Sequence, residues 1–312
     1  MGVMAIWWAA AGGLLALVAL AVAGRVGARW LLSPPKMSPN TVFPDRFGLA
    51  YEKVAFPASD GHALAGWWVP APMASRRTLL VCHGWGDNKG EILERTLFLN
   101  QREGFNLLYF DFRGHGESAA SLVTMGKLEL RDAAGAVRWL KEFRPREAAW
   151  LGVFGQSMGA AVASMALKEQ PDLLAAVLES PFAGYYEVAG RWAYDYARLP
   201  PFPVIDAMML WTRRLSGHRD VDRYNPQDRI AATEIPKLFI AGERDTLMPP
   251  SDVRRLHDLA RGPKEFWVVP GARHAKCLEA APGEYEARVG AFLRGCVESA
   301  GRASSGSSTT RG

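Results

Sequence analysis

The chain has 312 residues, of which 49% are hydrophobic and 22% are charged, and its formal net charge at pH 7 is +5. This length allows one large α/β domain, and the composition supplies an ample core and excludes a chain that is disordered throughout. The arginines are scattered and no zinc-knuckle, helix-turn-helix or RNA-recognition signature is present, so nucleic acid is not an expected partner. Cys82, Cys277 and Cys296 lack C-x-x-C spacing, which indicates neither a disulfide framework nor a zinc site.

The first predicted element is an apolar segment, residues 3–24, that contains no charged side chain. At a rise of about 1.5 Å per residue, a helix of this length spans a hydrocarbon layer of about 30 Å. Trp7 and Trp8 lie at one end and Trp30 beyond the other, as aromatic residues do at membrane interfaces. We therefore predict a transmembrane helix over residues 3–24, with Trp30 as an interfacial anchor.

The charges and small residues around this segment bear on its orientation and processing. Arg25, Arg29 and Lys36 all follow the apolar run, so the positive-inside rule places the following domain in the cytoplasm, behind a single-pass N-terminal anchor. The alternative is a cleaved signal peptide and an exported protein, because Ala21-Val22-Ala23 resembles a cleavage site. That alternative is disfavoured because no Lys or Arg precedes the apolar run.

The segments that flank the expected globular domain, residues 46–300, are predicted to be irregular. Residues 25–45 should form a juxtamembrane linker, because the prolines of Ser33-Pro34-Pro35-Lys36-Met37-Ser38-Pro39 cannot continue a helix. A chain that begins near Asn40 is therefore expected to be soluble and active. Residues 301–312 are rich in Ser, Gly and Thr and are predicted to form a disordered tail.

Strand-like and helix-like runs then alternate, which predicts an α/β fold with a mostly parallel central sheet and helices on both faces. Residues 54–57 and 63–69 flank the turn signal Ser59-Asp60-Gly61 and should form an antiparallel hairpin. Further strands are predicted at residues 78–82, 106–110, 148–154, 175–178, 237–241 and 265–269, and helices at residues 91–101, 128–143, 160–168, 251–260 and 282–297.

One stretch, residues 183–230, interrupts the alternation. It is rich in Tyr, Trp and Phe, contains Pro200-Pro201-Phe202-Pro203, and has no clear strand pattern. An insertion of this size after a strand end is typical of a helical cap over a site, and the alternative is extra packing outside the sheet. Aromatic side chains can line an apolar channel, so we expect a substrate with an apolar acyl or alkyl group.

The most informative motif is Gly155-Gln156-Ser157-Met158-Gly159, which lies between a strand-like and a helix-like run. A serine on such a turn exposes its hydroxyl, and Gly155 and Gly159 allow neighbouring backbone to approach closely. The backbone N–H of Met158 opens the helix and points toward developing negative charge. In this setting the motif predicts a nucleophile elbow, with Ser157 as the nucleophile.

A serine nucleophile needs a base within hydrogen-bond reach and a third group that orients the base. His274 follows the last predicted strand and is the candidate base. Asp245 follows the strand before it and is the candidate acid, with Glu179 in reserve. Because the carboxyl ends of parallel strands meet at one edge of a sheet, these side chains are expected to meet Ser157 there.

Acyl transfer also requires hydrogen-bond donors for the oxyanion. The backbone N–H of Met158 is the first predicted donor. The second is the N–H of Trp85 in the turn His83-Gly84-Trp85-Gly86, which follows a predicted strand. His83 and His115 lie in glycine-rich turns and are expected to shape loops rather than to act as the base.

Several ordered motifs carry a resemblance to a known family. They are Val81-Cys82-His83-Gly84-Trp85-Gly86-Asp87-Asn88-Lys89, Asp111-Phe112-Arg113-Gly114-His115-Gly116-Glu117-Ser118, the elbow at residues 155–159, Gly242-Glu243-Arg244-Asp245 and Gly271-Ala272-Arg273-His274. Over residues 52–296 the chain resembles the α/β-hydrolase superfamily, and most closely its Bem46-like and serine-aminopeptidase-like (S33-type) branch. The resemblance implies serine hydrolase activity on esters, thioesters or amides, without a cofactor or a metal.

The sequence therefore predicts a membrane-anchored serine hydrolase that acts on a small-molecule or lipid-like ester. An acyltransferase is an alternative, because an alcohol or amine can replace water in the second step. A non-catalytic binding protein on the same fold is disfavoured, because such a protein need not keep Ser157, Asp245, His274 and the elbow together. The motifs select no particular substrate, since this fold hosts many functions.

Overall fold

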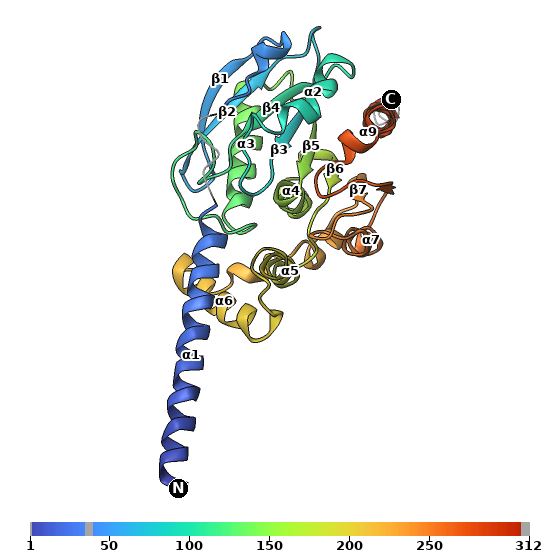
Figure 1. Ribbon diagram of the computed structural model, residues 1–312. Helices are drawn as coiled ribbons and strands as arrows, with labels where there is room; N and C mark the ends of the chain where they lie inside the picture. Colours follow the sequence, from blue (N-terminus) through green and yellow to red (C-terminus); the bar gives the residue numbers. More distant parts are fainter. Residues whose placement is uncertain (1, 35–39, 307–312) are drawn as a thin grey trace.

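The computed structural model describes residues 2–34 and 40–306 of the chain (Figure 1). Its strands are β1 (Glu52–Pro57), β2 (Ala63–Val69), β3 (Arg77–Cys82), β4 (Asn106–Phe110), β5 (Trp150–Gln156), β6 (Leu173–Glu179), β7 (Lys237–Gly242) and β8 (Lys264–Val269). Its helices are α1 (Gly2–Leu32), α2 (Leu93–Gln101), α3 (Glu129–Phe143), α4 (Met158–Glu169), α5 (Tyr185–Ala197), α6 (Pro201–Ser216), α7 (Pro250–Leu259), α8 (Cys277–Ala280) and α9 (Pro282–Gly306). Short 3₁₀ turns lie at η1 (Pro44–Phe47), η2 (Val221–Arg223), η3 (Pro226–Asp228) and η4 (Ile230–Ala232).

Within these described ranges the strands form one eight-stranded sheet in the order β1-β2-β4-β3-β5-β6-β7-β8. β1 and β2 form an antiparallel hairpin, β2 is also antiparallel to β4, and the remaining neighbours are parallel. The α/β fold, the mostly parallel sheet and the opening hairpin predicted from the sequence are therefore confirmed.

The strand register aligns the carboxyl ends of the parallel strands. Cys82 at the end of β3 pairs with Gly155 of β5, and Gly242 at the end of β7 pairs with Val269 at the end of β8. The loops that follow β3, β5, β7 and β8 consequently leave the sheet at the same edge. These loops carry the site residues predicted from the sequence.

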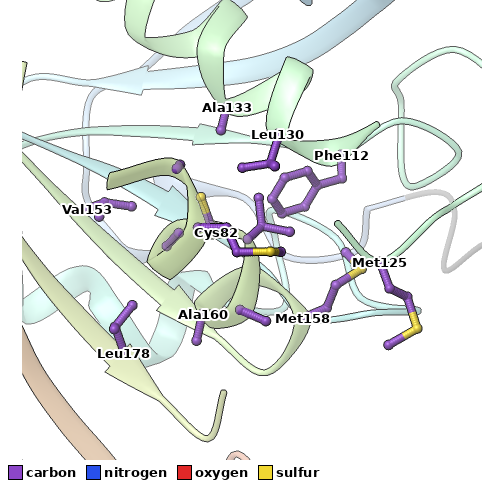
Figure 2. Close-up of a cluster of buried hydrophobic side chains, with 14 of the residues drawn as sticks. Cys82, Phe112, Met125, Leu130, Ala133, Val153, Met158, Ala160 and Leu178 are labelled. Atoms are coloured by element: carbon purple, nitrogen blue, oxygen red, sulfur yellow. The ribbon is translucent and has the colours of Figure 1, made fainter. Parts of the chain in front are cut away.

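Helices cover both faces of the sheet, with α3, α4 and α7 on one face and α2 and α9 on the other. In β3, Leu80 and Cys82 belong to the first core, whereas Leu79 and Val81 belong to the second, because side chains alternate along a strand. Figure 2 shows part of the first core, in which side chains of the sheet and of α3 pack around Met158 at the start of α4. A dense core thus supports the turn that leads into α4.

Two helices extend further than the sequence predicted. α1 continues to Leu32, so residues 25–32 are helical rather than part of the irregular linker predicted at residues 25–45. Burial of this end of α1 explains the difference, because tertiary packing contributes most of the stability of a helix. α9 continues to Gly306, so residues 301–306 are helical rather than disordered. The rest of that predicted tail, residues 307–312, and residues 35–39 of the predicted linker lie outside the described residues.

The buried end of α1 packs against α6 through small residues. A Cβ atom on Gly24 would lie 2.7 Å from the backbone carbonyl carbon of Ala207, and one on Gly27 would lie 3.1 Å from Met208 Sδ. Residues without a side chain let two helices approach this closely. The first part of α1, residues 2–19, is exposed and projects well beyond the domain (Figure 1). α6 belongs to the predicted insertion, residues 183–230, which consists of α5, α6 and short 3₁₀ turns.

Candidate active site

Ser157 stands on the sharp turn between β5 and α4. Its backbone has φ 55° and ψ −120°, a conformation that costs a residue with a side chain about 1–3 kcal/mol. The Ser157 N–H donates to the carbonyl of Glu179 at 2.8 Å, and the Ser157 carbonyl accepts from the N–H of Ala161 at 3.1 Å. The strand–turn–helix setting of the predicted elbow is therefore present, and its backbone is strained at the serine itself.

The two glycines of the elbow lie where backbone segments meet. A Cβ atom on Gly155 would lie 2.5 Å from the carbonyl oxygen of Gly159, and one on Gly159 would overlap the carbonyl group of Cys82. A side chain at Gly155 would thus push α4 away from β5, and one at Gly159 would push α4 away from the end of β3. The glycines are explained by this close approach, as the sequence motif predicts.

We expect Gly159→Ala to lower both the melting temperature and the activity of the protein. The added methyl group must displace backbone at the end of β3, and overpacking of this kind typically costs about 1–3 kcal/mol. Gly295→Ala in α9 is the matched control, because a Cβ atom there meets open space and alanine favours a helix. Thermal unfolding measures the effect, and equal melting temperatures for the two variants would contradict the packing argument.

Ser157, His274 and Asp245 form a continuous chain of hydrogen bonds. The Ser157 Oγ and His274 Nε2 atoms are 2.9 Å apart, and His274 Nδ1 lies 2.8 Å from Asp245 Oδ2. The second oxygen, Asp245 Oδ1, accepts from the backbone N–H groups of Leu247 at 3.1 Å and Met248 at 2.8 Å. The three side chains that follow β5, β7 and β8 are thus brought together as the sequence predicts.

The partners of Asp245 determine which way protons can move through this chain. Asp245 is buried, and its carboxylate accepts hydrogen bonds from two amides and from the imidazole. His274 Nδ1–H is therefore the donor to Asp245, which leaves Nε2 with a lone pair that accepts the Ser157 hydroxyl proton. This is the arrangement that general-base activation of a serine requires.

His83 and His115 tie two loops together next to the site. His83 Nε2 accepts from the N–H of Phe112 at 3.0 Å, and its Nδ1 lies 2.7 Å from the carbonyl of Gly84. His115 Nε2 accepts from the N–H of Gly86 at 3.1 Å. Burial lowers the pKa of His83 and lowers that of His115 to about 4, so both rings are neutral near pH 7. Their contacts agree with the loop-shaping roles expected from the sequence.

A buried ion pair adds to this connection, and the sequence analysis missed it. Lys89 Nζ lies 2.5 Å from Asp111 Oδ2 and 2.5 Å from Glu117 Oε2, and the Lys89 N–H donates to Asp111 Oδ1 at 2.7 Å. Lys89 and Asp111 are both fully buried. The motifs at residues 81–89 and 111–118 are therefore one structural unit that supports the loop beside Ser157. The sequence signal for this ion pair was the presence of a lysine, Lys89, in one motif and of the acidic residues Asp111 and Glu117 in the other.

The reserve acid candidate, Glu179, has different partners. Its carboxylate accepts from the Tyr285 hydroxyl at 2.7 Å and from the N–H of Cys277 at 3.3 Å. Asp245, by contrast, is hydrogen-bonded directly to His274. The geometry therefore favours Asp245 as the group that orients the imidazole and assigns Glu179 to packing between β6, α8 and α9.

The turn predicted to supply the second oxyanion donor lies against the serine. A Cβ atom on Gly84 would lie 3.5 Å from Ser157 Cβ, so the turn after β3 touches the elbow. The Trp85 side chain lines the same cavity as Ser157, and its Nε1–H donates to the Leu31 carbonyl at 3.0 Å. That the backbone N–H groups of Trp85 and Met158 bind an oxyanion stays a prediction.

A cavity of about 240 Å³ opens next to Ser157 and His274. Its wall is mainly apolar and comes from three parts of the chain: the end of α1, the segments that follow β3, β4, β5, β7 and β8, and α5. The lining residues are Trp30, Leu31, Trp85, Met125, Ser157, Val188, Ala189, Trp192, Leu247, Met248 and His274. Helix α5 thus covers the site, which is the position expected for the insertion at residues 183–230.

The position of Trp30 differs from the sequence prediction. Its ring stacks on Trp192 of α5 with centroids 3.9 Å apart, and it lies 4.7 Å from the ring of Trp85. It therefore belongs to the wall of the cavity rather than serving only as an interfacial anchor. The hydropathy of α1 contains no signal for this contact, because the partners lie 55 or more residues away in the chain.

Comparisons with known proteins place the chain in a family. A family model described as serine aminopeptidase, S33 matches residues 73–212. The uncharacterized protein Rv2307c of Mycobacterium tuberculosis is 32% identical over 83% of this chain and 86% of its own length. The α/β hydrolase domain-containing protein WAV2 of Arabidopsis thaliana is 27% identical over 87% of this chain and 88% of its own. A solved structure of the Pyrococcus furiosus esterase Pf2001 superimposes with a TM-score of 0.71 at 29% identity, covering 85% of this chain and 97% of the esterase.

The fold, the ordered motifs and these relatives all indicate the same family. The chain belongs to the α/β-hydrolase superfamily. These similarities support the conclusion that the protein is a hydrolase. Helix α1 has the length and the apolar composition that crossing a membrane requires.

Proposed function

We propose that this protein is a membrane-anchored serine hydrolase that cleaves an ester, thioester or amide bond of a substrate with an apolar acyl group. The observation that carries the proposal is the hydrogen-bonded chain of Ser157, His274 and Asp245, of which Ser157 and His274 line an apolar cavity. The strained backbone of Ser157 supports it, because such strain persists mainly at functional sites.

The proposed reaction follows from the hydrogen bonds. Ser157 Oγ attacks the substrate carbonyl carbon while His274 Nε2 takes the hydroxyl proton, and Asp245 stabilises the imidazolium. The backbone N–H groups of Met158 and Trp85 donate to the oxyanion. His274 then protonates the leaving group, which leaves an acyl group on Ser157. Water, activated by His274, hydrolyses this acyl-enzyme and restores the serine.

The cavity supports an acyl group of modest length as the bound part of the substrate. Its volume of about 240 Å³ is below the range of about 300–1,000 Å³ that is usual for drug-sized ligands. Side chains such as Met125, Val188 and Leu247 offer it no charged group. A single acyl chain fits such a wall better than a polar or charged group, because burial of an unpaired polar group costs free energy.

The exposed apolar surface of α1 supports the proposal that the protein is anchored in a membrane. Residues 2–19 are exposed along an apolar helix, a surface that is costly in water and favourable in lipid. Arg25 and Arg29 follow this surface, which supports a cytoplasmic position for the hydrolase domain. Export after cleavage of a signal peptide is the competing outcome, and sequencing of the mature N-terminus distinguishes the two.

Labelling with a fluorophosphonate tests the enzymatic proposal. We expect the full-length protein in detergent to be labelled at Ser157 and to hydrolyse p-nitrophenyl esters of medium chain length faster than acetyl esters. Labelling without any turnover of esters, thioesters or amides would favour acyl transfer instead. A protein that is not labelled at all would contradict the serine hydrolase function.

A further inference from the structure

The last turn of α1 makes specific contacts at the site. Trp30 is stacked on Trp192 and adjoins Trp85, and the Leu31 carbonyl accepts the hydrogen bond of the Trp85 indole N–H. Trp30 and Leu31 both line the cavity that contains Ser157. A helix that is apolar enough to cross a membrane therefore ends as part of the wall of the candidate active site.

This turn is held from several directions. The carbonyl of Leu32 accepts from the Val123 N–H at 2.8 Å, and Leu31 and Leu32 are buried. One turn earlier, Ala28 is fully buried, and Gly24 lies directly against Ala207 of α6. The turn is consequently fixed relative to the cap and to the loop after β4, and the groups that it presents to the cavity have defined positions.

We propose that the last turn of α1 is a functional part of the substrate site, in which Trp30 limits the length of the acyl group and the Leu31 carbonyl positions Trp85. The inference rests on the proposed serine hydrolase function and adds to it the determinant of chain-length specificity. It makes Trp30 a specificity-determining residue and Leu31 a positioning residue.

The Leu31 carbonyl needs a hydrogen-bond donor from outside α1, and the Trp85 indole N–H is placed to provide it. The last carbonyl groups of a helix have no partner within it, and the residue four positions after Leu31 is Pro35, which has no N–H group. The Trp85 indole supplies the missing donor. In return, the side chain of Trp85 is fixed, and with it the turn whose N–H is proposed to bind the oxyanion. A shift of about 1 Å in such a group can cost on the order of a hundredfold in rate.

Trp30 closes the cavity on the side of α1. Trp30 is 40% exposed, so it both lines the cavity and reaches solvent, and it belongs to the same helix as the exposed apolar residues 2–19. An acyl chain that exceeds the cavity meets this indole. When the indole is removed, further methylene groups can continue past the rim and lie along α1, where each one that leaves water favours binding.

The test measures chain-length profiles of full-length protein in detergent. We expect Trp30→Ala to move the optimum of kcat/KM for p-nitrophenyl esters to longer chains, with a gain of about fourfold for each further methylene that becomes buried. Trp30→Phe, which keeps an aromatic ring of smaller size, should give an intermediate profile. The control is Val26→Ala, because Val26 lies on the same helix and is 62% exposed.

A second variant tests the positioning role through a different readout. Trp85→Phe keeps an aromatic ring in the cavity but removes the indole N–H that binds Leu31. We expect kcat and the rate of fluorophosphonate labelling to fall by roughly tenfold while KM stays nearly constant, because the defect lies in oxyanion binding rather than in substrate binding. If the indole N–H of Trp85 had a purely structural role, Trp85→Phe would lower the melting temperature without lowering kcat selectively at constant KM.

The outcomes separate this inference from the function on which it rests. Wild-type protein that is neither labelled nor active would remove the serine hydrolase function and the inference together. Active wild-type protein whose chain-length profile is the same in Trp30→Ala, Trp30→Phe and Val26→Ala would overturn the inference alone. If Trp30→Ala does not fold, the profile of Trp30→Phe decides, since a small shift to longer chains is still expected.

Discussion

Ser157→Ala should abolish ester hydrolysis and fluorophosphonate labelling, with a fall in kcat on the order of 10⁵–10⁶. The reason is that the Ser157 hydroxyl lies 2.9 Å from His274 Nε2, where both residues line the cavity, so this change removes the oxygen that we propose forms the acyl-enzyme. Single-turnover labelling and initial rates with medium-chain esters measure the effect. His274→Ala should be comparably severe, because the base and the nucleophile act as one unit.

The control for this variant is Ser164→Ala, which makes the same change within the helix that follows Ser157. Ser164 is buried in α4, and its hydroxyl donates to the Ala161 carbonyl at 2.7 Å rather than to a group of the site. It should lose about 1 kcal/mol of stability and keep its activity. Labelling that persists in Ser157→Ala at the wild-type rate would contradict the assignment of the nucleophile.

Asp245→Asn tests the third member of the chain, and we expect kcat to fall on the order of 10⁴. The amides of Leu247 and Met248 hold one oxygen of the side chain in place, so the new NH₂ group would face His274 Nδ1. The imidazole would then have to carry its proton on Nε2, where it cannot accept the serine proton. If Glu179→Gln were the severe variant and Asp245→Asn were near wild type, the acid would be Glu179 instead.

Local patterns were sufficient to predict the sheet and the placement of the candidate site residues at the carboxyl edge of its parallel strands. Ser157, Asp245 and His274 each lie in the segment that follows a parallel strand, and parallel strands bring their carboxyl ends to one edge whatever the packing of the helices. The hairpin of β1 and β2 could also be predicted from local sequence, because a turn signal separates two neighbouring strand-like runs.

The wall of the cavity could not be predicted in this way. Trp30 meets Trp85 and Trp192 because α1 packs against α6, and that packing depends on small residues whose partners are distant in the chain. In the sequence, Trp30 has the position of a membrane-interface residue, and composition cannot distinguish that role from tertiary contact. The buried pair of Lys89 and Asp111 was missed for the same reason, since pairing is not visible in either motif alone.

Two shortened chains should separate the proposed membrane role of α1 from its proposed role at the site. From the sequence, a chain that begins near Asn40 is expected to be soluble and active, but such a chain lacks the turn that lines the cavity. A chain that begins at Gly24 removes the exposed apolar part of α1 and keeps the part that packs on α6. The packing therefore predicts different activity and stability for these two chains, which differ only in residues 24–39.

We expect the chain that begins at Gly24 to leave the membrane fraction and to keep its activity and chain-length profile. The chain that begins at Asn40 should lose most of its activity and unfold at lower temperature. Loss of buried Leu31 and Leu32 alone removes about 3–6 kcal/mol, at about 1.5–3 kcal/mol for each side chain, from a total stability of about 5–15 kcal/mol.

Carbonate extraction, initial rates and thermal unfolding of the full-length protein and both shortened chains measure these effects. Equal activity and equal melting temperatures for the two shortened chains would mean that α1 serves the membrane alone, against the contacts of Trp30 and Leu31. If expression of the full-length sequence gives a protein with a mature N-terminus at Gly24, the apolar part is instead a cleaved signal. Because residues 24–32 remain in that product, its pocket wall would be intact, and the exported enzyme should be as active as the anchored one.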